Sequence, residues 1–345
     1  MDLSIALLLG QDGLTNGAIY ALLALALVMV FAVTRVIFIP QGQFVAYGAL
    51  TLAALQMGKT PGTLWLLIGL GALAVLMDAW TAIRDRQARK LIRSLAFNLL
   101  VPLVIAGLLM SLTPATLPLP VQIVLALVLV VPLGPMLYRV AYQPLSEATV
   151  LTLLIVSVAV DFAMMGLGLL FFGPEAFRTP AFSEGSLTLG ELTINAQTLW
   201  VVGCSAFLIV VLFLFFERTL YGKALRATAL NRVGARLMGI PTTLAGKLTF
   251  FVAALIGTFS GLLFAPITPI SYDTGFLIGL KGFVAAILGG LGSYPLAAVG
   301  ALFVGLLESF SSFWASEYKE VIVFTIIIPV LLWRSLFSHH VEEEE

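Results

Sequence analysis

Runs of apolar residues about as long as a membrane-crossing helix recur along the whole chain, and they restrict the possible folds more than any other feature. A helix needs about 20 predominantly apolar residues to cross the hydrocarbon core of a bilayer. Eleven segments of this 345-residue chain reach or approach that length. They lie at 13–34, 37–57, 63–80, 95–112, 121–139, 148–172, 197–217, 247–267, 276–292, 294–313 and 320–335.

The composition fits a chain that uses lipid as its solvent. Hydrophobic residues make up 60% of the sequence and charged residues only 10%, whereas soluble domains carry about 25% charged residues. We therefore expect an all-α fold, a polytopic transmembrane helical bundle of about 8–11 membrane segments that forms a single domain over 1–345. The segments 37–57 and 276–292 are rich in glycine or polar residues, so either can be re-entrant or broken.

The lysine and arginine residues predict how the bundle is oriented, because these residues concentrate in cytoplasmic loops. Basic clusters at 84–93 and 218–247 should lie inside the cell, whereas the loop 173–196, with one arginine and three glutamates, should face outside. Threading the chain through these loops places the N-terminus outside and the C-terminus in the cytoplasm. Of the 18 basic residues, 14 then lie inside, three lie outside, and Lys281 falls within an apolar segment.

The basic loop 218–246 is predicted to form one short amphipathic helix, at 226–240, outside the membrane. The stretch Gly239-Ile240-Pro241 is a helix stop signal. Such a helix can rest on lipid headgroups or dock into a groove of a soluble partner, and the pattern alone leaves both interpretations open. Its apolar residues recur at helical spacing with arginines between them: Ala227, Leu230, Gly234, Leu237 and Met238.

Several classes of function find no support in the residues. The net charge of zero leaves no basic footprint for nucleic acid. Cys204 is the only cysteine, and the two histidines, His339 and His340, are adjacent in the tail. We therefore expect no metal site, no cofactor and no catalytic residues. The chain also lacks the G-x-x-x-x-G-K-[ST] loop that binds nucleotide phosphates, so it is not expected to hydrolyse ATP by that mechanism.

Four sequence motifs occur in a recognisable order. Residues 16–22 read N-G-A-I-Y-A-L, residues 142–145 read Y-Q-P-L, and residues 279–293 follow G-x-K-[AG]-F-x-A-A-x-L-G-G-x-G-S. The loop 218–246 contains R-A-x-x-x-N-x-x-x-A-x-x-x-G-I. Together these motifs resemble those of the branched-chain amino acid ABC transporter permeases, within the wider hydrophobic amino acid uptake class. The resemblance implies that the loop is the ATPase-coupling segment, through Arg226, Ala227, Asn231, Ala235, Gly239 and Ile240.

The resemblance implies a multi-subunit importer in the bacterial cytoplasmic (inner) membrane. This chain and a second, related permease subunit would form the pathway within the membrane lipid. Two ABC ATPase subunits would drive transport from the cytoplasm, and an extracytoplasmic substrate-binding protein would deliver the solute. This division of work agrees with the absence of a phosphate-binding loop from the chain.

The chain departs from the family pattern in two places. Residues 38–43 read F-I-P-Q-G-Q, whereas many relatives carry N-F-A-H-G-[ED] there, with a histidine and a carboxylate. The solute is therefore open between leucine, isoleucine and valine on one side and urea, short amides or aromatic acids on the other. Residues 60–118 look like an insertion that adds about two hydrophobic segments.

Some polar and glycine residues in apolar segments are candidates for the translocation pathway. A charged residue in mid-membrane costs about 2.5–3.5 kcal/mol on insertion scales, so Lys281 should either face a cavity or pair with a carboxylate such as Glu308. The glycines at 289–292 can form either a packed turn or a flexible break. The candidate pathway residues are Gln41, Gly42, Lys281, Gly289, Gly290 and Gly292.

An alternative function is an ion-coupled secondary transporter or channel that uses Asp161, Lys281 and Glu308 as a relay. Many secondary transporters contain inverted repeats, and none is visible in this sequence. A coupling-type loop has no purpose in an ion-driven carrier. The sequence therefore favours the importer subunit.

Overall fold

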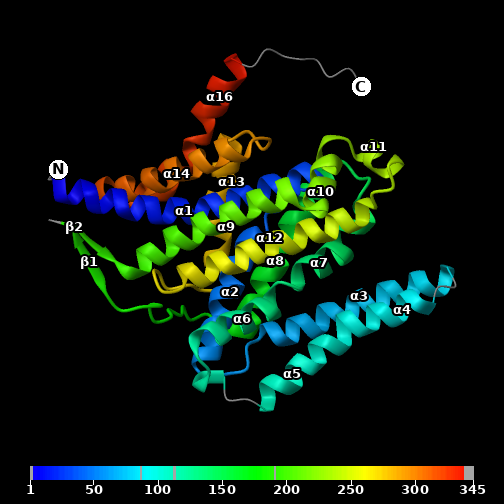
Figure 1. Ribbon diagram of the computed structural model, residues 1–345. Coiled ribbons are helices and arrows are strands. Elements are labelled where there is room, and N and C mark those ends of the chain that lie inside the picture. Colours follow the sequence, from blue (N-terminus) through cyan, green and yellow to red (C-terminus); the bar gives the residue numbers. More distant parts are fainter. Residues whose placement is uncertain (1–2, 86–87, 112–113, 190–191, 338–345) are drawn as a thin grey trace.

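The computed structural model describes residues 3–85, 88–111, 114–189 and 192–337 as a helical bundle with one small hairpin (Figure 1). The side chains of the basic cluster at 84–93 and the two histidines of the tail lie outside the described part. In the described part, seven helical stretches are long and apolar enough to cross a membrane, which confirms the predicted polytopic all-α fold. They are Leu3–Thr34, Thr63–Trp80, Leu119–Leu145, Val150–Phe172, Ala196–Arg218, Thr242–Phe264 and Tyr294–Trp314.

The helices follow one another with short connections. In chain order they are α1 (Leu3–Thr34), α2 (Gln41–Gln56), α3 (Thr63–Asp85), α4 (Ala88–Leu95), α5 (Val101–Ser111), α6 (Leu119–Val130), α7 (Leu133–Leu137), α8 (Val150–Phe172), α9 (Ala196–Arg218), α10 (Leu220–Leu230), α11 (Arg232–Leu237), α12 (Thr242–Phe264), α13 (Thr274–Leu288), α14 (Tyr294–Trp314), α15 (Lys319–Thr325) and α16 (Ile327–Phe337).

Several predicted segments differ from the observed helices. The first helix begins at Leu3, ten residues before the predicted segment 13–34. Helices α2 and α13 have 16 and 15 residues, so each is at most about 24 Å long, short of the roughly 30 Å of a bilayer core. The segment 320–335 is divided between α15 and α16. Hydropathy alone overestimates the number of full crossings because short, buried helices are as apolar as spanning ones.

The core forms around α1 and α2. Helix α1 is apolar on all sides and buried nearly continuously from Gly17 to Val30, as expected for a helix with neighbours all round it. Helices α1 and α14 approach closely through glycine, since a Cβ atom on Gly305 would lie 2.6 Å from the Cα of Gly17. Small residues of this kind let membrane helices pack backbone to backbone.

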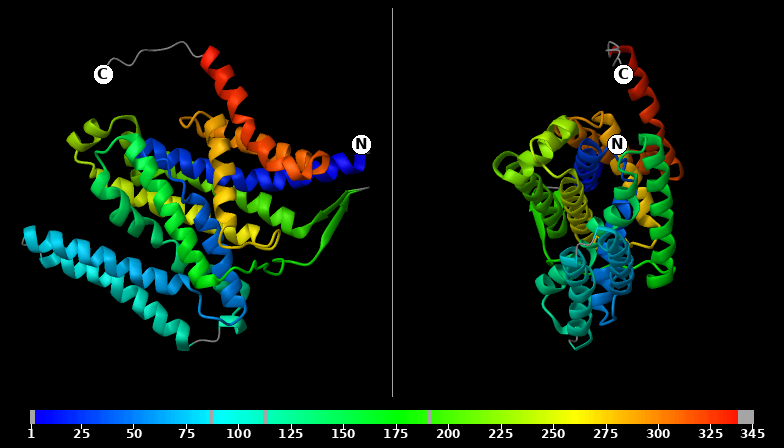
Figure 2. Two further views of the ribbon diagram at one scale, coloured as in Figure 1. Left: turned by 180° about the vertical axis from the view of Figure 1, so that it is seen from behind. Right: turned by 90° about the vertical axis from the view of Figure 1, so that its right-hand side faces the viewer.

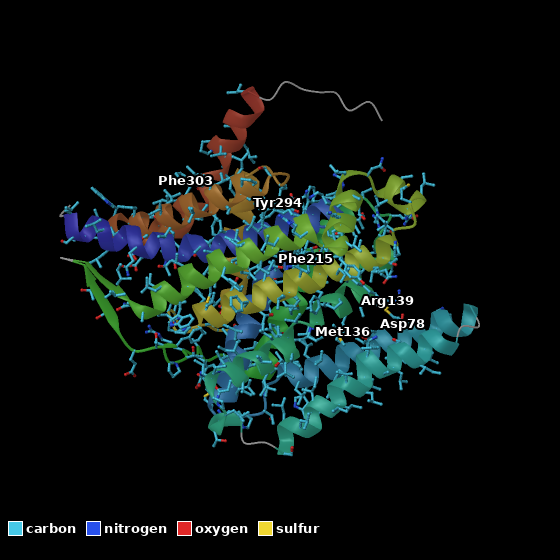
Figure 3. The ribbon with its side chains drawn as sticks, viewed as in Figure 1. Asp78, Met136, Arg139, Phe215, Tyr294 and Phe303 are labelled. Atoms are coloured by element: carbon cyan, nitrogen blue, oxygen red, sulfur yellow. The ribbon has the colours of Figure 1, made fainter. Side chains whose placement is uncertain are left out.

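The stretch predicted as an insertion, 60–118, contains a pair of helical rods that projects from the bundle. Helix α3 lies beside the rod made by α4 and α5 (Figures 1 and 2). Arg139 donates from Nε to Oδ1 of Asp78 at 2.7 Å, and this contact ties α3 to the segment after α7 (Figure 3). The Ser94 hydroxyl donates to the same carboxylate at 2.6 Å. The pair of rods is therefore anchored to the bundle at a polar point.

The two loops with opposite predicted orientation lie at opposite ends of the bundle. The hairpin of β1 (Ser186–Leu189) and β2 (Leu192–Asn195) is antiparallel and lies near the start of α1, whereas α10 and α11 lie at the other end (Figure 1). The acidic loop 173–196 and the basic loop 218–246 are thus separated by the length of the membrane helices.

Candidate coupling segment and buried polar sites

The loop 218–246 folds as two short helices joined at an angle, which we call the elbow (220–240). The prediction of one continuous helix across 226–240 was wrong, because α10 ends at Leu230 and α11 begins at Arg232. Asn231 between them has an extended backbone, and its Oδ1 accepts a hydrogen bond from the Gly234 N–H at 2.8 Å. Asparagine is among the preferred N-cap residues, so this side chain both interrupts the first helix and begins the second.

The end of the elbow is a Schellman C-cap. Gly239 has φ +82°, a left-handed conformation that glycine adopts without a steric penalty. The Gly239 N–H donates to the Arg236 carbonyl at 3.0 Å, and the Ile240 N–H donates to the Ala235 carbonyl at 2.9 Å. These two bonds define the motif. The spacing N-x-x-x-A-x-x-x-G-I therefore encodes one complete short helix with both of its caps.

Three arginines fix the elbow to the bundle. Arg226 pairs with Glu217 at the end of α9, with Nη2 2.8 Å from Oε1. Arg232 donates from Nη1 to the Ser146 carbonyl at 3.0 Å, just after the Y-Q-P-L motif at 142–145. Arg236 donates to the Thr242 hydroxyl at 3.2 Å. The structure thus brings together two motifs that are about 90 residues apart, and Arg232 and Arg236 were not among the predicted site residues.

Large apolar side chains of the elbow are exposed. Leu230, Leu237 and Met238 are each 83% exposed, whereas Ala235 of the motif is buried. Apolar side chains that protrude from an otherwise basic helix are typical of surfaces that meet a hydrophobic groove or the interfacial region of a bilayer. This geometry fits both a helix that rests on lipid headgroups and a helix that docks into a groove of a soluble partner.

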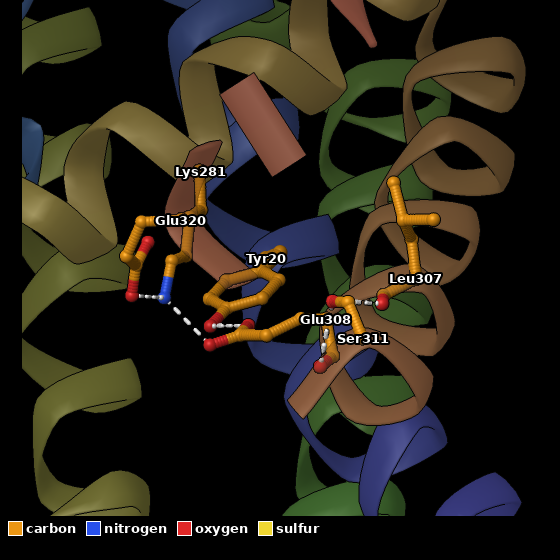
Figure 4. Close-up of polar contacts among 6 residues, drawn as sticks. All are labelled: Tyr20, Lys281, Leu307, Glu308, Ser311 and Glu320. Carbon is orange, nitrogen blue, oxygen red and sulfur yellow. Dashed lines mark hydrogen bonds and ion pairs between the residues drawn. The ribbon is translucent and has the colours of Figure 1, made fainter. Parts of the chain in front are cut away.

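Lys281 lies in a buried cluster of charged and polar side chains (Figure 4). Its Nζ lies 2.6 Å from Oε1 of Glu308 on α14 and 3.0 Å from Oε1 of Glu320 on α15. The Tyr20 hydroxyl donates to the other oxygen of Glu308 at 2.6 Å. The predicted pairing of Lys281 with Glu308 is confirmed. The sequence reasoning missed Tyr20 and Glu320, although Tyr20 lies in the motif at 16–22.

Asp161 belongs to a different buried cluster. It lies on the inward face of α8, next to Gln43 of α2 and one turn after Ser157. No hydrogen bond of ordinary geometry forms at either carboxylate oxygen of Asp161 within the described residues. Among the described residues, no hydrogen bond or ion pair joins Asp161 to Lys281 or Glu308, so the structure does not connect the three residues of the predicted relay.

The candidate pathway residues on α2 lie where helices pack together. The Gln41 side chain donates from Nε2 to the Ala253 carbonyl of α12 at 2.9 Å. A Cβ atom on Gly42 would lie 2.6 Å from the Cα of Gly279 on α13. Both residues therefore hold α2 against its neighbours.

The glycine turn at 289–292 lies beside the elbow. Gly289 packs against Ala297, since a Cβ atom there would lie 2.5 Å from the Ala297 Cα, and Gly290 has φ +76°. These two glycines therefore form a packed turn. Gly290 and Gly292 also line a cavity of about 580 Å³ together with Arg226. The motif that contains Arg226 and the glycine motif thus meet at one cavity.

A second cavity, of about 670 Å³, opens beside the β-hairpin. Its lining includes side chains of both charges, and Glu308 links it to the Lys281 cluster. The charged residues in this lining are Asp12, Arg178, Glu184, Glu308 and Lys319.

Comparison with known proteins identifies relatives over most of the chain. Residues 94–331 match the family described as branched-chain amino acid transport system / permease component. The high-affinity branched-chain amino acid transport system permease protein LivH of Escherichia coli (strain K12) is 33% identical over 219 residues, which cover 60% of this chain and 70% of that protein. The corresponding permease protein BraD of Pseudomonas aeruginosa is 26% identical over 339 residues, covering 94% of this chain and 92% of that protein. Among solved structures, PsaBC from Streptococcus pneumoniae in complex with Fab matches 95% of this chain and 91% of that chain, with a TM-score of 0.39 and 11% identity.

Proposed function

We propose that this chain, a member of the family of branched-chain amino acid transport system permease components, is the transmembrane subunit of an ATP-driven ABC importer. Its solutes would be branched-chain or related amino acids. The observation that carries the proposal is the elbow at 220–240. It is a capped helical unit at one end of the bundle, held by three arginines, with large apolar side chains exposed.

The elbow is suited to passing force from a partner to the membrane helices. The chain has no phosphate-binding loop, so a separate ATPase must supply the energy. A coupling element must be rigid, and the Asn231 cap, the Gly239 cap and the contact of Arg232 with Ser146 each restrict the elbow. We assign the docking of one of the two ABC ATPase subunits to this surface, with Leu237 and Met238 entering an apolar groove.

The two ends of the bundle support a definite orientation. The excess of arginine around the elbow supports a cytoplasmic position for it, with the β-hairpin and the start of α1 on the outer side. The substrate-binding protein would approach the hairpin end, where the larger cavity opens. A second, related permease subunit would complete the pathway, and the bacterial inner membrane would surround both.

Reconstitution tests this function directly. The chain is co-expressed with the adjacent genes, purified, and placed in liposomes that enclose ATP. The binding protein and labelled leucine, isoleucine or valine are then added outside the liposomes. We expect ATPase subunits to co-purify and uptake to require ATP. Uptake by this chain alone, driven by an ion gradient without ATP, would overturn the importer and favour a secondary transporter.

A further inference from the structure

The cavity of about 580 Å³ beside the elbow has a lining suited to an amphiphile. Its walls come from α1, α9, α10 and α14, and nearly all of its lining is apolar. One wall is α9, the least buried of the seven spanning helices in the described part of the chain. The cavity therefore borders the region that lipid occupies. Phe213 of α9, which lines it, is 62% exposed.

Two arginines lie at the end of the cavity nearest the elbow. Arg35 follows the last residue of α1, and Arg226 lies on α10. Arg226 is held by Glu217, whereas no hydrogen bond or ion pair of the Arg35 side chain occurs among the described residues. An apolar pocket with cationic side chains at one end is complementary to a molecule with an apolar body and an anionic head.

The backbone around the cavity is strained. Arg35 and Leu291 are the only residues other than glycine with positive φ in the described part of the chain, at +62° and +56°, and both line this cavity. Such conformations are unfavourable for side chains with a Cβ atom and tend to cluster at functional sites. At Arg35 the turn ends α1, with the Arg35 N–H donating to the Phe31 carbonyl at 2.8 Å.

We propose that this cavity binds one anionic phospholipid of the cytoplasmic leaflet, with its phosphate at Arg35 and Arg226 and an acyl chain along α9 and α14. The rings of Phe216 and Tyr294, tilted by 31° with centroids 6.0 Å apart, pack α9 against α14 beside the proposed acyl chain (Figure 3 labels Tyr294). The proposal does not depend on the transport function, because it concerns the purified permease and a lipid. It places a lipid between the elbow and the glycine turn at 289–292.

The test is native mass spectrometry of the purified permease in neutral detergent. The protein is titrated with phosphatidylglycerol and with phosphatidylcholine of the same acyl chains. We expect phosphatidylglycerol to bind about fivefold or more tightly, because each arginine near an anionic headgroup strengthens binding by about that factor. Inorganic phosphate at equal concentration should not compete, since it lacks the acyl chains.

Two kinds of variant separate the headgroup from the acyl chain. Arg35→Gln should reduce the affinity for phosphatidylglycerol about fivefold, whereas Lys59→Gln, an exposed lysine outside the cavity, should leave it unchanged. Ala298→Phe and Ala32→Phe add side-chain volume from two different walls and should weaken both lipids. Equal binding of the two lipids by the unaltered protein, or equal affinities of the Arg35 and Lys59 variants, would overturn the site and leave only non-specific lipid contact. Size-exclusion profiles establish that each variant is folded.

Discussion

Lys281 of α13 and Glu308 of α14 form an ion pair of 2.6 Å inside the helical bundle. Glu320 of α15 adds a second carboxylate, and Tyr20 of α1 donates a hydrogen bond to Glu308. The cluster therefore joins four helices through buried polar contacts. Paired charges are the usual form in which ionisable residues persist inside a membrane.

Replacing Lys281 by methionine should strongly destabilise the bundle. Removal of one partner of a buried ion pair costs about 3–5 kcal/mol, because the remaining charge has no partner. We expect the thermal midpoint in detergent to fall, while Lys59→Met, an exposed control, leaves it unchanged. The double variant Lys281→Met/Glu308→Gln should lose less stability than the two single losses added together. Strict additivity would show that the pair is not coupled.

Aspartate at Leu237 or Met238 should uncouple transport without unfolding the membrane part. Both side chains are exposed, so the folded monomer loses little, but an apolar groove on an ATPase would have to bury a charge. We expect ATP-driven uptake to fall about tenfold or more, which corresponds to ~1.4 kcal/mol of docking free energy. Met57→Asp, at the exposed C-terminal end of α2 and outside both the elbow and the hairpin, should transport normally. Normal uptake by both elbow variants would remove the docking assignment.

Gly239→Val should distort the end of α11. Valine is disfavoured at φ +82°, and forcing it into that conformation costs of order 1–3 kcal/mol. ATP hydrolysis in the assembled complex should continue while uptake falls. Asparagine tolerates this conformation better than other residues with a Cβ atom, so Gly239→Asn should recover most of the uptake. Equal defects in the valine and asparagine variants would contradict a role for the left-handed backbone.

Arg226→Glu should also uncouple hydrolysis from uptake, because it places two carboxylates together where Arg226 now pairs with Glu217. Restoring the pair in reverse, with Glu217→Arg in the same chain, should recover uptake if the salt bridge to α9 is what matters. If the double variant stays uncoupled, Arg226 acts through another contact, such as the ATPase or the cavity beside the elbow.

Gly42→Ala distinguishes a packing role from a pathway role. A Cβ atom there would lie 2.6 Å from the Gly279 Cα, so α2 and α13 would have to separate. We expect a loss of at least ~1–3 kcal/mol in stability, as for other overpacked cores, and a lower yield of folded protein in size-exclusion chromatography. A stable variant with an altered solute preference would instead favour the pathway. Gly203→Ala on α9, where a Cβ atom meets nothing within 4 Å, is the matched control.

Several local features of the fold could be predicted from particular residues. The apolar runs predicted the long helices, since hydropathy depends only on neighbouring residues. The pairing of Lys281 with Glu308 could be proposed because a membrane-buried ammonium needs a partner and Glu308 lies in the adjacent segment. The break at Asn231 could also have been predicted, because asparagine is a preferred N-cap residue. The prediction of a single helix did not take this into account.

The sequence by itself determined that this chain is a helical membrane protein with a basic loop between two apolar segments. Composition, apolar run length and motif spacing are properties of contiguous residues. Only the tertiary structure decided that Arg232 holds the elbow to Ser146, that Glu320 and Tyr20 complete the Lys281 cluster, and that Asp161 stays apart from it. These outcomes depend on distances between segments far apart in the chain, which the packing of the helices sets and which no local pattern encodes.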